Sequence, residues 1–270
     1  MISNSNIMRR GTWLLAISCG LLAVGCQKVI NVDLNSTSPT IVIVGNINDQ
    51  PGPYTVTLNQ TVNFSEPNTF PKIDGAFVAI SDNAGNVDTL VETTSGTYNT
   101  KKIMGVAGRT YYLTVKANGQ TYTSSSTMPQ AVTFDTLELY TVANPFQSGD
   151  TLKYPEVGFQ DPGDGALYYY RFIETRNDTL LSNVYVIDNQ YSGGRYITYP
   201  LRSDTSLANG DNVKVEMQCI DEGTYKYFST FYEASGSTNE TPANPVSNIT
   251  NNALGYFSAH TSRYKTIKVP

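Results

Sequence analysis

The sequence predicts a mainly β fold, and three observations support this expectation. Charged residues make up only 15% of the 270 residues, while Thr, Asn, Ser, Tyr, Val and Gly are abundant, and these types favour strands and turns over helices. Short segments that alternate apolar and polar side chains recur along the chain, which is the period of a half-buried strand. Asn118 and Gly119 separate two such segments, and an Asn-Gly pair is the strongest short-range signal for a β-hairpin.

Residues 40–128 are expected to form an immunoglobulin-like β-sandwich. The apolar run 41–44 fits a buried strand, and a turn at residues 50–53 leads into the alternating segment 54–58. Further strands are expected at residues 76–80 and 87–91, after Gly96, and at residues 111–115 and 120–123. About seven short strands in roughly 90 residues are typical of this architecture. The likeness is architectural only, because the Cys…Trp…Cys pattern of antibody domains is absent from this sequence.

Residues 129–270 are expected to form a second β-rich domain with one helix. Asp221 can cap a helix over residues 221–234. Three aromatic residues would share one face of it at i, i+3 and i+7: Tyr225, Phe228 and Tyr232. Strands are expected at residues 134–142, 155–159, 167–175, 181–187, 195–201, 213–220, 253–259 and 266–269. The sequence leaves the order of these strands open.

Residues 1–25 have the pattern of a bacterial lipoprotein signal peptide. Arg9 and Arg10 precede an apolar run over residues 13–24, and a small residue then precedes Cys26. The run of about 12 residues is too short for the roughly 20 that a membrane-spanning helix needs. The segment before the cysteine resembles the lipobox of bacterial lipoproteins, which implies cleavage before Cys26 and a diacylglyceryl thioether on its sulfur.

A second cysteine, Cys19, is a rival acceptor for the lipid. Its apolar run would cover only residues 13–17, which is too short for a signal peptide, so Cys26 is the predicted lipidation site. Residues 26–39 then form the lipidated cysteine and a polar tether. The lipid anchor predicts a protein that is held at a membrane surface.

The charge balance argues against nucleic acid as a partner. Removal of residues 1–25 takes away Arg9 and Arg10 and no acidic residue, so a net charge of −5 becomes −7 in the mature chain. A negative surface repels phosphate backbones and offers no polybasic patch for a membrane.

The sequence shows no constellation of catalytic residues. Cys219 is the only free thiol once Cys26 is acylated, and its alternating segment favours a buried core residue. His260 is the single histidine, so it cannot form a histidine cluster for zinc. No phosphate loop or dinucleotide fingerprint occurs. We expect a non-catalytic protein without a cofactor; a hydrolase that uses two carboxylates alone is the less favoured alternative.

Two features are candidates for ligand contact. Residues 161–165 contain two aspartates that suggest calcium, but the spacing of a hand-type loop is not met, so a solvated hairpin turn is favoured. Tyrosines gather in the second domain: Tyr168, Tyr169, Tyr170, Tyr185, Tyr191, Tyr196 and Tyr199. Exposed tyrosines can stack on a sugar or hold a peptide, although on alternating strands half of them point into the core. Tyr191 and Tyr196 are the candidates for contact.

Several segments together form a recognisable pattern. They are Cys26 with residues 29–34, and residues 43–47, 50–56, 75–76, 80–82, 244–249 and 253–259. This pattern resembles an uncharacterised lipoprotein family of Bacteroidota, domain of unknown function 4249. Members often carry two glycines where Asn251 and Asn252 stand here, which keeps a turn-compatible pair. The resemblance implies an accessory role at the cell envelope, because members are commonly encoded beside outer-membrane TonB-dependent transporters. It also implies a location at the outer membrane, where the lipid-anchored protein is either periplasmic or surface-exposed. The resemblance carries over no catalytic residue.

The bulky residues near the C-terminus have two interpretations. Tyr256 and Phe257 follow a turn, so they fit a closing strand that fixes the helix to a sheet, or else a contact surface for a partner. The expected function is a ligand-capture or docking accessory of a TonB-dependent transporter. A structural or adhesive surface lipoprotein is the plainer alternative.

The mature N-terminal residue should be an acylated Cys26. Mass spectrometry of the N-terminal peptide of the membrane-bound protein should show Cys26 carrying a diacylglyceryl group and an acylated amine, because one acyl chain anchors only marginally and two or more anchor stably. An unmodified Cys26 in a membrane-released protein would contradict the prediction.

Overall fold

The computed structural model describes residues 39–63, 66–235 and 243–270. The predicted signal peptide, Cys26 and most of the tether therefore lie outside the described residues. The described chain contains sixteen strands and one helix, α2 (Glu222–Ser235), which confirms a mainly β fold. Within these residues no helix is both long and apolar enough to cross a membrane.

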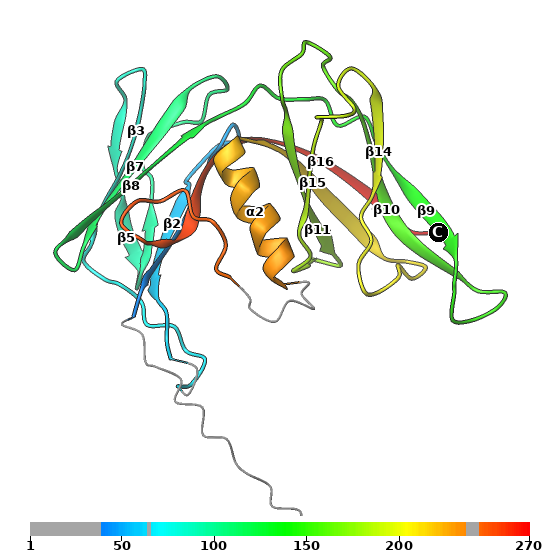
Figure 1. The fold of residues 1–270 in the computed structure, drawn as a ribbon, viewed down its shortest axis with the longest axis horizontal. Helices are drawn as coiled ribbons and strands as arrows, with labels where there is room; N and C mark the ends of the chain where they lie inside the picture. Colours follow the sequence, from blue (N-terminus) through cyan, green and yellow to red (C-terminus); the bar gives the residue numbers. More distant parts are fainter. Residues whose placement is uncertain (1–38, 64–65, 236–242) are drawn as a thin grey trace, which may run out of the picture. The chain divides into compact units, whose positions relative to one another are not determined.

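The first core is a sandwich of two sheets (Figure 1). One sheet contains β1 (Ile41–Asn48), β2 (Thr55–Gln60), β6 (Thr97–Asn99) and β5 (Val91–Thr94), in that order. The other contains β4 (Val87–Thr89), β3 (Phe77–Asp82), β7 (Thr110–Ala117) and β8 (Gln120–Thr127). In the letters used for immunoglobulin-like domains, strands β1 to β8 are A, B, C, C′, D, E, F and G. The two sheets are then A-B-E-D and C′-C-F-G, which is an arrangement of immunoglobulin-like sandwiches. The predicted sandwich class is confirmed.

Two local features show why the sequence adopts this sandwich. Asn118 and Gly119 have φ values of 51° and 74° and join β7 to β8 as a two-residue hairpin, as predicted. Tyr111, at the start of the F strand, is fully buried, and its hydroxyl donates to the Met104 carbonyl at 3.1 Å. The same hydroxyl accepts the Val106 N–H at 2.7 Å. This is the tyrosine corner that fixes the E–F connection in such sandwiches.

The second core is also enclosed by two sheets. A three-stranded sheet contains β14 (Tyr196–Pro200), β10 (Thr151–Gln160) and β9 (Thr136–Ala143). The facing sheet contains β11 (Tyr169–Arg176), β15 (Asn212–Ile220) and β16 (Leu254–Lys268), with β12 (Thr179–Leu180) and β13 (Tyr185–Asp188) both paired to the outer side of β11. Phe159, Tyr170 and Phe172 meet in the space between, with ring centroids 4.6 and 6.1 Å from Phe159.

β16 belongs to both cores. Its first half pairs parallel with β1, from Val42 opposite Leu254 to Asn48 opposite His260. Its second half pairs antiparallel with β15, starting with Cys219 opposite Thr261. One nine-stranded sheet therefore runs through both cores.

This shared strand corrects the expected division into residues 40–128 and 129–270. Residues near the C-terminus, including Ile249, Ala253 and Phe257, are buried in the first core. The expected strands 253–259 and 266–269 are parts of the single strand β16. The alternation of β16 predicted a strand, but parallel pairing with β1 depends on contacts more than 200 residues apart in sequence, which no local pattern contains.

Helix α2 lies against the face of the second sheet that points away from the second core (Figure 1). Asp221 caps it: its Oδ1 accepts the Thr224 N–H at 2.9 Å, and its Oδ2 accepts the Thr127 N–H at 3.1 Å from the end of β8. Phe228 is buried beneath the helix, whereas Tyr232 is 61% exposed. The helix is thus fixed to the first sandwich at its N-terminus and covers the second with its body.

Gly255 is required where β16 enters the first core. Its φ is +91°, and a Cβ at this position would overlap the carbonyl oxygen of Ile43 on β1. Gly119 also has a positive φ, of +74°, but a Cβ there would meet nothing within 4 Å.

These two glycines give a matched pair of variants. Gly119→Ala should lower the free energy of unfolding by about 1–2 kcal/mol, because only the left-handed backbone is strained. Gly255→Ala should cost more than about 4 kcal/mol, because β1 and β16 must also move apart. Urea unfolding followed by circular dichroism measures the unfolding free energy of both variants. Equal losses of stability would show that the close contact between Gly255 and the Ile43 carbonyl does not matter.

Candidate functional site

A cleft lies at the open edge of the second sandwich. β13 pairs only with β11, and β14 pairs only with β10, so within the described chain each is the edge strand of its sheet. The space between these edges and the last turns of α2 is a cavity of about 370 Å³. We call it the tyrosine cleft. Its lining residues are Asn183, Val184, Tyr185, Val186, Tyr199, Pro200, Arg202 and Tyr232.

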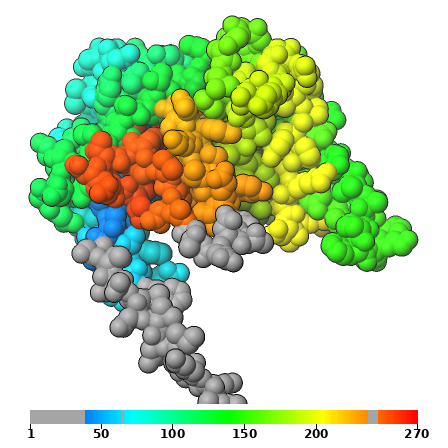
Figure 2. All heavy atoms as spheres, viewed as in Figure 1, coloured from blue at the N-terminus to red at the C-terminus, as the bar shows by residue number. Residues whose placement is uncertain are grey.

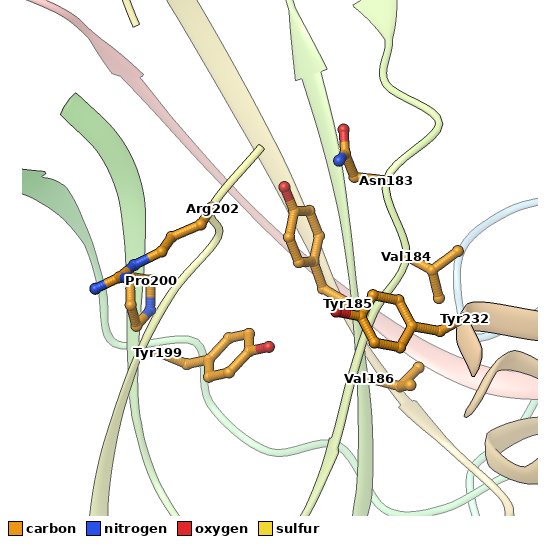
Figure 3. A pocket seen from close by; sticks show the side chains of 8 residues that line it. All are labelled: Asn183, Val184, Tyr185, Val186, Tyr199, Pro200, Arg202 and Tyr232. Carbon is orange, nitrogen blue, oxygen red and sulfur yellow. The ribbon is translucent and has the colours of Figure 1, made fainter. Parts of the chain in front are cut away.

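Three tyrosines from three elements point into this space (Figure 3). Tyr185 comes from β13 and is buried, Tyr199 comes from β14 and is half-buried, and Tyr232 comes from α2 and is exposed. The Tyr199 ring packs on Phe172 of the second core, with centroids 5.9 Å apart. Burial raises the pKa of the Tyr199 hydroxyl above its usual value. The Tyr199 hydroxyl is therefore a neutral hydrogen-bonding group at pH 7.

Arg202 gives the cleft a fixed positive charge. Its Nη2 donates to the Tyr140 hydroxyl at 2.8 Å, and its guanidinium carbon lies 5.0 Å from the centroid of the Tyr140 ring. This contact restrains an otherwise mobile side chain, so that less conformational entropy is lost when a ligand binds.

A buried carboxylate on β11 adds an unsatisfied polar atom near Tyr185. Glu174 is 1% exposed, and its Oε1 accepts from Arg176 at 2.9 and 3.3 Å. Within the described chain neither Glu174 Oε2 nor the Tyr185 hydroxyl has a hydrogen-bond partner. Burial raises the pKa of Glu174, against the effect of Arg176. Burial, followed by the charge of Glu174, raises the pKa of Tyr185. Buried polar groups without a partner cost stability, so these two atoms next to the cleft are available to a ligand's polar groups only if the site opens further.

A second hollow adjoins the cleft on the other side of residues 183–184. It has a volume of about 450 Å³ and lies between α2 and strands β11, β15 and β16. We call it the helix hollow. Its lining residues are Arg171, Ile173, Thr175, Leu180, Leu181, Ser182, Asn183, Val184, Lys214, Glu216, Phe228, Phe231 and Tyr264. In Figure 2 helix α2 (orange) is exposed on the surface beside these segments.

The four residues expected to contact a ligand or partner do not come together. Tyr191 is 84% exposed and lines a separate hollow near residues 163–167. Tyr196 lies on β14 with its hydroxyl 3.3 Å from Thr136 Oγ1. Tyr256 packs under the helix, with its ring centroid 4.8 Å from that of Phe228. Phe257 has no exposed surface in the first core, so its suggested partner contact is wrong in this structure.

The two aspartates of residues 161–165 differ: Asp164 is exposed, as expected for a solvated turn, whereas Asp161 is buried. Asp161 is 1% exposed, so it does not lie in a solvated turn. Its Oδ1 accepts the N–H groups of Gly163 and Gly194 at 3.2 and 2.7 Å. Its Oδ2 accepts from Tyr170 and Asn189, both at 2.9 Å. These donors occupy the oxygens that a calcium ion would need, and the carboxylate joins two loops instead.

Cys219 and His260 occupy separate buried environments. Burial raises the pKa of the Cys219 thiol, which lies in the second core. Burial lowers the pKa of His260 to about 4, and its ring lies 3.1 Å from both Gln218 Nε2 and Ser258 Oγ. No group of three or more His, Cys, Asp or Glu side chains in the described residues could hold a metal ion.

The sequence identified the tyrosine-rich region but missed the cleft. Tyr185 and Tyr199 stood out only as members of a group, and nothing distinguished Arg202 or Asn183. The lining residues come from two edge strands, a loop and a helix, and their convergence has no signature in sequence spacing.

This architecture defines a two-sandwich β protein with an open cleft beside its helix. The chain belongs to the family described as Domain of unknown function (DUF4249), whose sequence profile matches residues 27–266. No curated protein matches the chain. A two-domain fibronectin type III segment of chicken tenascin is 11% identical and covers 86% of this chain and 100% of its own length. Its TM-score is 0.23, a value too low to carry a structural argument.

Glu174 should make stability depend on pH. A carboxyl whose pKa is raised in the folded state contributes stability that is present below the unfolded value of about 4.3 and is lost as the pH rises through the folded value. The difference in unfolding free energy between the wild type and Glu174→Gln should therefore fall as the pH rises above 4 and through the raised pKa of Glu174 in the folded protein. Urea unfolding between pH 4 and 8 measures it. The exposed Glu138→Gln is the control, and identical profiles for the two variants would contradict the prediction.

Proposed function

We propose that the protein is a non-catalytic cell-envelope lipoprotein that captures a ligand for an outer-membrane TonB-dependent transporter. The observation that carries the proposal is the tyrosine cleft, in which Tyr185, Tyr199 and Tyr232 converge from three elements. Tyrosine supplies a large, rigid contact area with a polar end at a low cost in conformational entropy. Cavities of about 300–1,000 Å³ are typical of small-molecule sites, and both hollows fall in this range.

The position of the cleft supports binding. Edge strands present backbone donors and acceptors that lack a neighbour, and here β13 and β14 present them on both sides of one cavity. A ligand can therefore use backbone groups for affinity and the tyrosine and arginine side chains for orientation.

The membrane location rests on the sequence. The pattern before Cys26 supports a lipid anchor, and residues 26–39 provide a polar tether. The proposed anchor restricts diffusion to the membrane surface, which raises the effective concentration of the protein near a membrane partner. The transporter as partner follows from the family resemblance.

Chemistry in the cleft favours binding over a carboxylate hydrolase. Glycosidases place two carboxyl groups about 5–10 Å apart across the scissile bond. Among the described residues, the lining of the tyrosine cleft contains no carboxylate, and that of the helix hollow contains Glu216 alone.

Purification of the acylated protein from membranes in mild detergent should recover a β-barrel transporter in stoichiometric amount, identified by mass spectrometry. In a deletion strain, uptake of the transporter's nutrient should fall and should be restored by the wild type. The double variant Tyr199→Ala/Tyr232→Ala should not restore it, because it removes two of the three tyrosine side chains that line the cleft.

The matched control is Tyr112→Ala, which removes a tyrosine that is 44% exposed on the first sandwich. It should restore uptake like the wild type. Recovery of the lipoprotein alone, together with normal uptake in the deletion strain, would remove the transporter role and favour a structural or adhesive protein.

A further inference from the structure

The helix hollow has more positive charge than the described chain neutralises. Its charged lining residues are Arg171, Lys214 and Glu216, which leaves a net charge of +1 in a cavity otherwise lined by neutral groups. The three ion pairs of the described residues lie elsewhere, so neither cation has a carboxylate within 4.0 Å. A charge held away from water is costly unless it is paired, which makes this excess informative.

Arg171 is the deeper of the two cations. It points from β11 toward the helix, and its guanidinium carbon lies 3.8 Å from the centroid of the Phe228 ring. Its one hydrogen bond in the described chain runs from Nη1 to Gln218 Oε1 at 3.1 Å. A guanidinium carries five N–H donors, and the other nitrogens of Arg171 are not among the buried atoms without partners. They are therefore open to a ligand in the hollow.

Glu216 forms no ion pair with Arg171, although its charge acts on the guanidinium from a distance and is included in the net charge of +1. Its Oε1 accepts from Gln218 Nε2 at 2.9 Å and from Ser262 Oγ at 2.7 Å. Gln218 thus stands between Arg171 and Glu216, with its amide oxygen toward the first and its amide nitrogen toward the second. The network fixes the guanidinium in place and leaves its charge unpaired, which is the preorganisation that binding sites require.

Lys214 adds a second cation at the rim. It is exposed on β15, and its ammonium lies 4.6 Å from the centroid of the Tyr264 ring. On β11, Thr175 lies opposite Lys214 and Arg171 lies opposite Gln218, so the two cations lie at opposite ends of the hollow.

The wall between the cations is apolar. Ile173, Leu180, Leu181 and Phe231 line it, and Leu180 and Phe231 are 66% and 38% exposed. Exposed apolar groups next to a fixed cation suit a ligand that carries both an apolar part and an anionic group.

We propose that the helix hollow binds an organic acid, in which Arg171 receives the carboxylate, Lys214 adds attraction at the rim, and an apolar body lies against Leu180, Leu181 and Phe231. The net charge of +1 matches a single carboxylate better than a doubly charged phosphate, and the planar guanidinium matches carboxylate geometry. The inference rests on the proposed ligand capture and gives the chemical class of ligand that the helix hollow, next to the tyrosine cleft, would take.

Isothermal titration of the acylated full-length protein in detergent tests this assignment with two matched probes. 4-Phenylbutanoate should bind at least about tenfold more tightly than its neutral amide, because a charge-assisted hydrogen bond contributes about 1.5–3 kcal/mol and 1.4 kcal/mol is tenfold. Inorganic phosphate should not compete with it. The tripeptide Ala-Leu-Phe and its C-terminal amide form a second pair; preference for either acid over its amide supports the site and shows whether a free acid or a peptide C-terminus is the better source.

Three variants locate the site. Arg171→Gln should weaken binding of the acid about tenfold or more and leave the amide unchanged. Lys214→Gln should weaken it about threefold, and the loss should shrink at high salt, because Lys214 is exposed. The control is Lys226→Gln, which removes an exposed lysine of α2 that does not line the hollow.

The thermal midpoint of Arg171→Gln shows whether this variant is folded. Lys214→Gln keeps the test independent of folding, because the Lys214 side chain is exposed. Equal binding of acid and amide, unchanged affinity in both variants, or no binding of any acid would overturn the assignment. The uptake assay with the Tyr199→Ala/Tyr232→Ala variant does not involve Arg171, so failure here is distinguishable from failure of the proposed function.

Discussion

The structure depends on one strand that changes partner. β16 pairs with β1 up to His260 and with β15 from Thr261 onward, so its backbone groups are satisfied by two cores in succession. Asp49 stabilises the change: its Oδ1 accepts the Ser262 N–H at 2.8 Å, and its Oδ2 pairs with Arg263. Burial opposes the charge of Asp49, but these contacts lower its pKa, so the carboxylate is held ionised. Without this pairing β1 would end as an open edge.

The same strand positions the candidate site. Strands β11, β15 and β16 have an outer face that points away from the second core, and α2 covers this face. Asp221 holds the helix there, because it caps the N-terminus of α2 and also accepts a hydrogen bond from the end of β8. The helix does not fill the space around it: Phe228 and Phe231 line the helix hollow, and Tyr232 lines the tyrosine cleft. The sites thus arise from incomplete coverage of a sheet and from an unclosed sandwich edge, where polar groups can meet solvent and ligand together.

The buried polar network beneath the helix has two effects. Gln218 contacts Arg171, Glu216 and His260 at 2.9 to 3.1 Å and so connects three strands. Networks of this kind fix side-chain positions when every member is satisfied. Burial disfavours the charged form of His260, whose pKa is about 4, so the network is neutral at that position at pH 7. The charged members of the network are Arg171 and Glu216, which Gln218 separates, and Arg171 lines the hollow.

The sequence by itself determined the class of fold, much of the strand content and the helix near residues 221–234. These features follow from local periodicity, turn chemistry at Asn118 and Gly119, and a capping aspartate, all of which act within a few residues. Only the tertiary structure decided the pairing of β1 with β16, the burial of Phe257 and Asp161, and the convergence of Tyr185, Tyr199 and Tyr232. Those outcomes depend on which distant segments meet, and burial area and hydrogen-bond satisfaction across the whole chain select them, so no local pattern contains them.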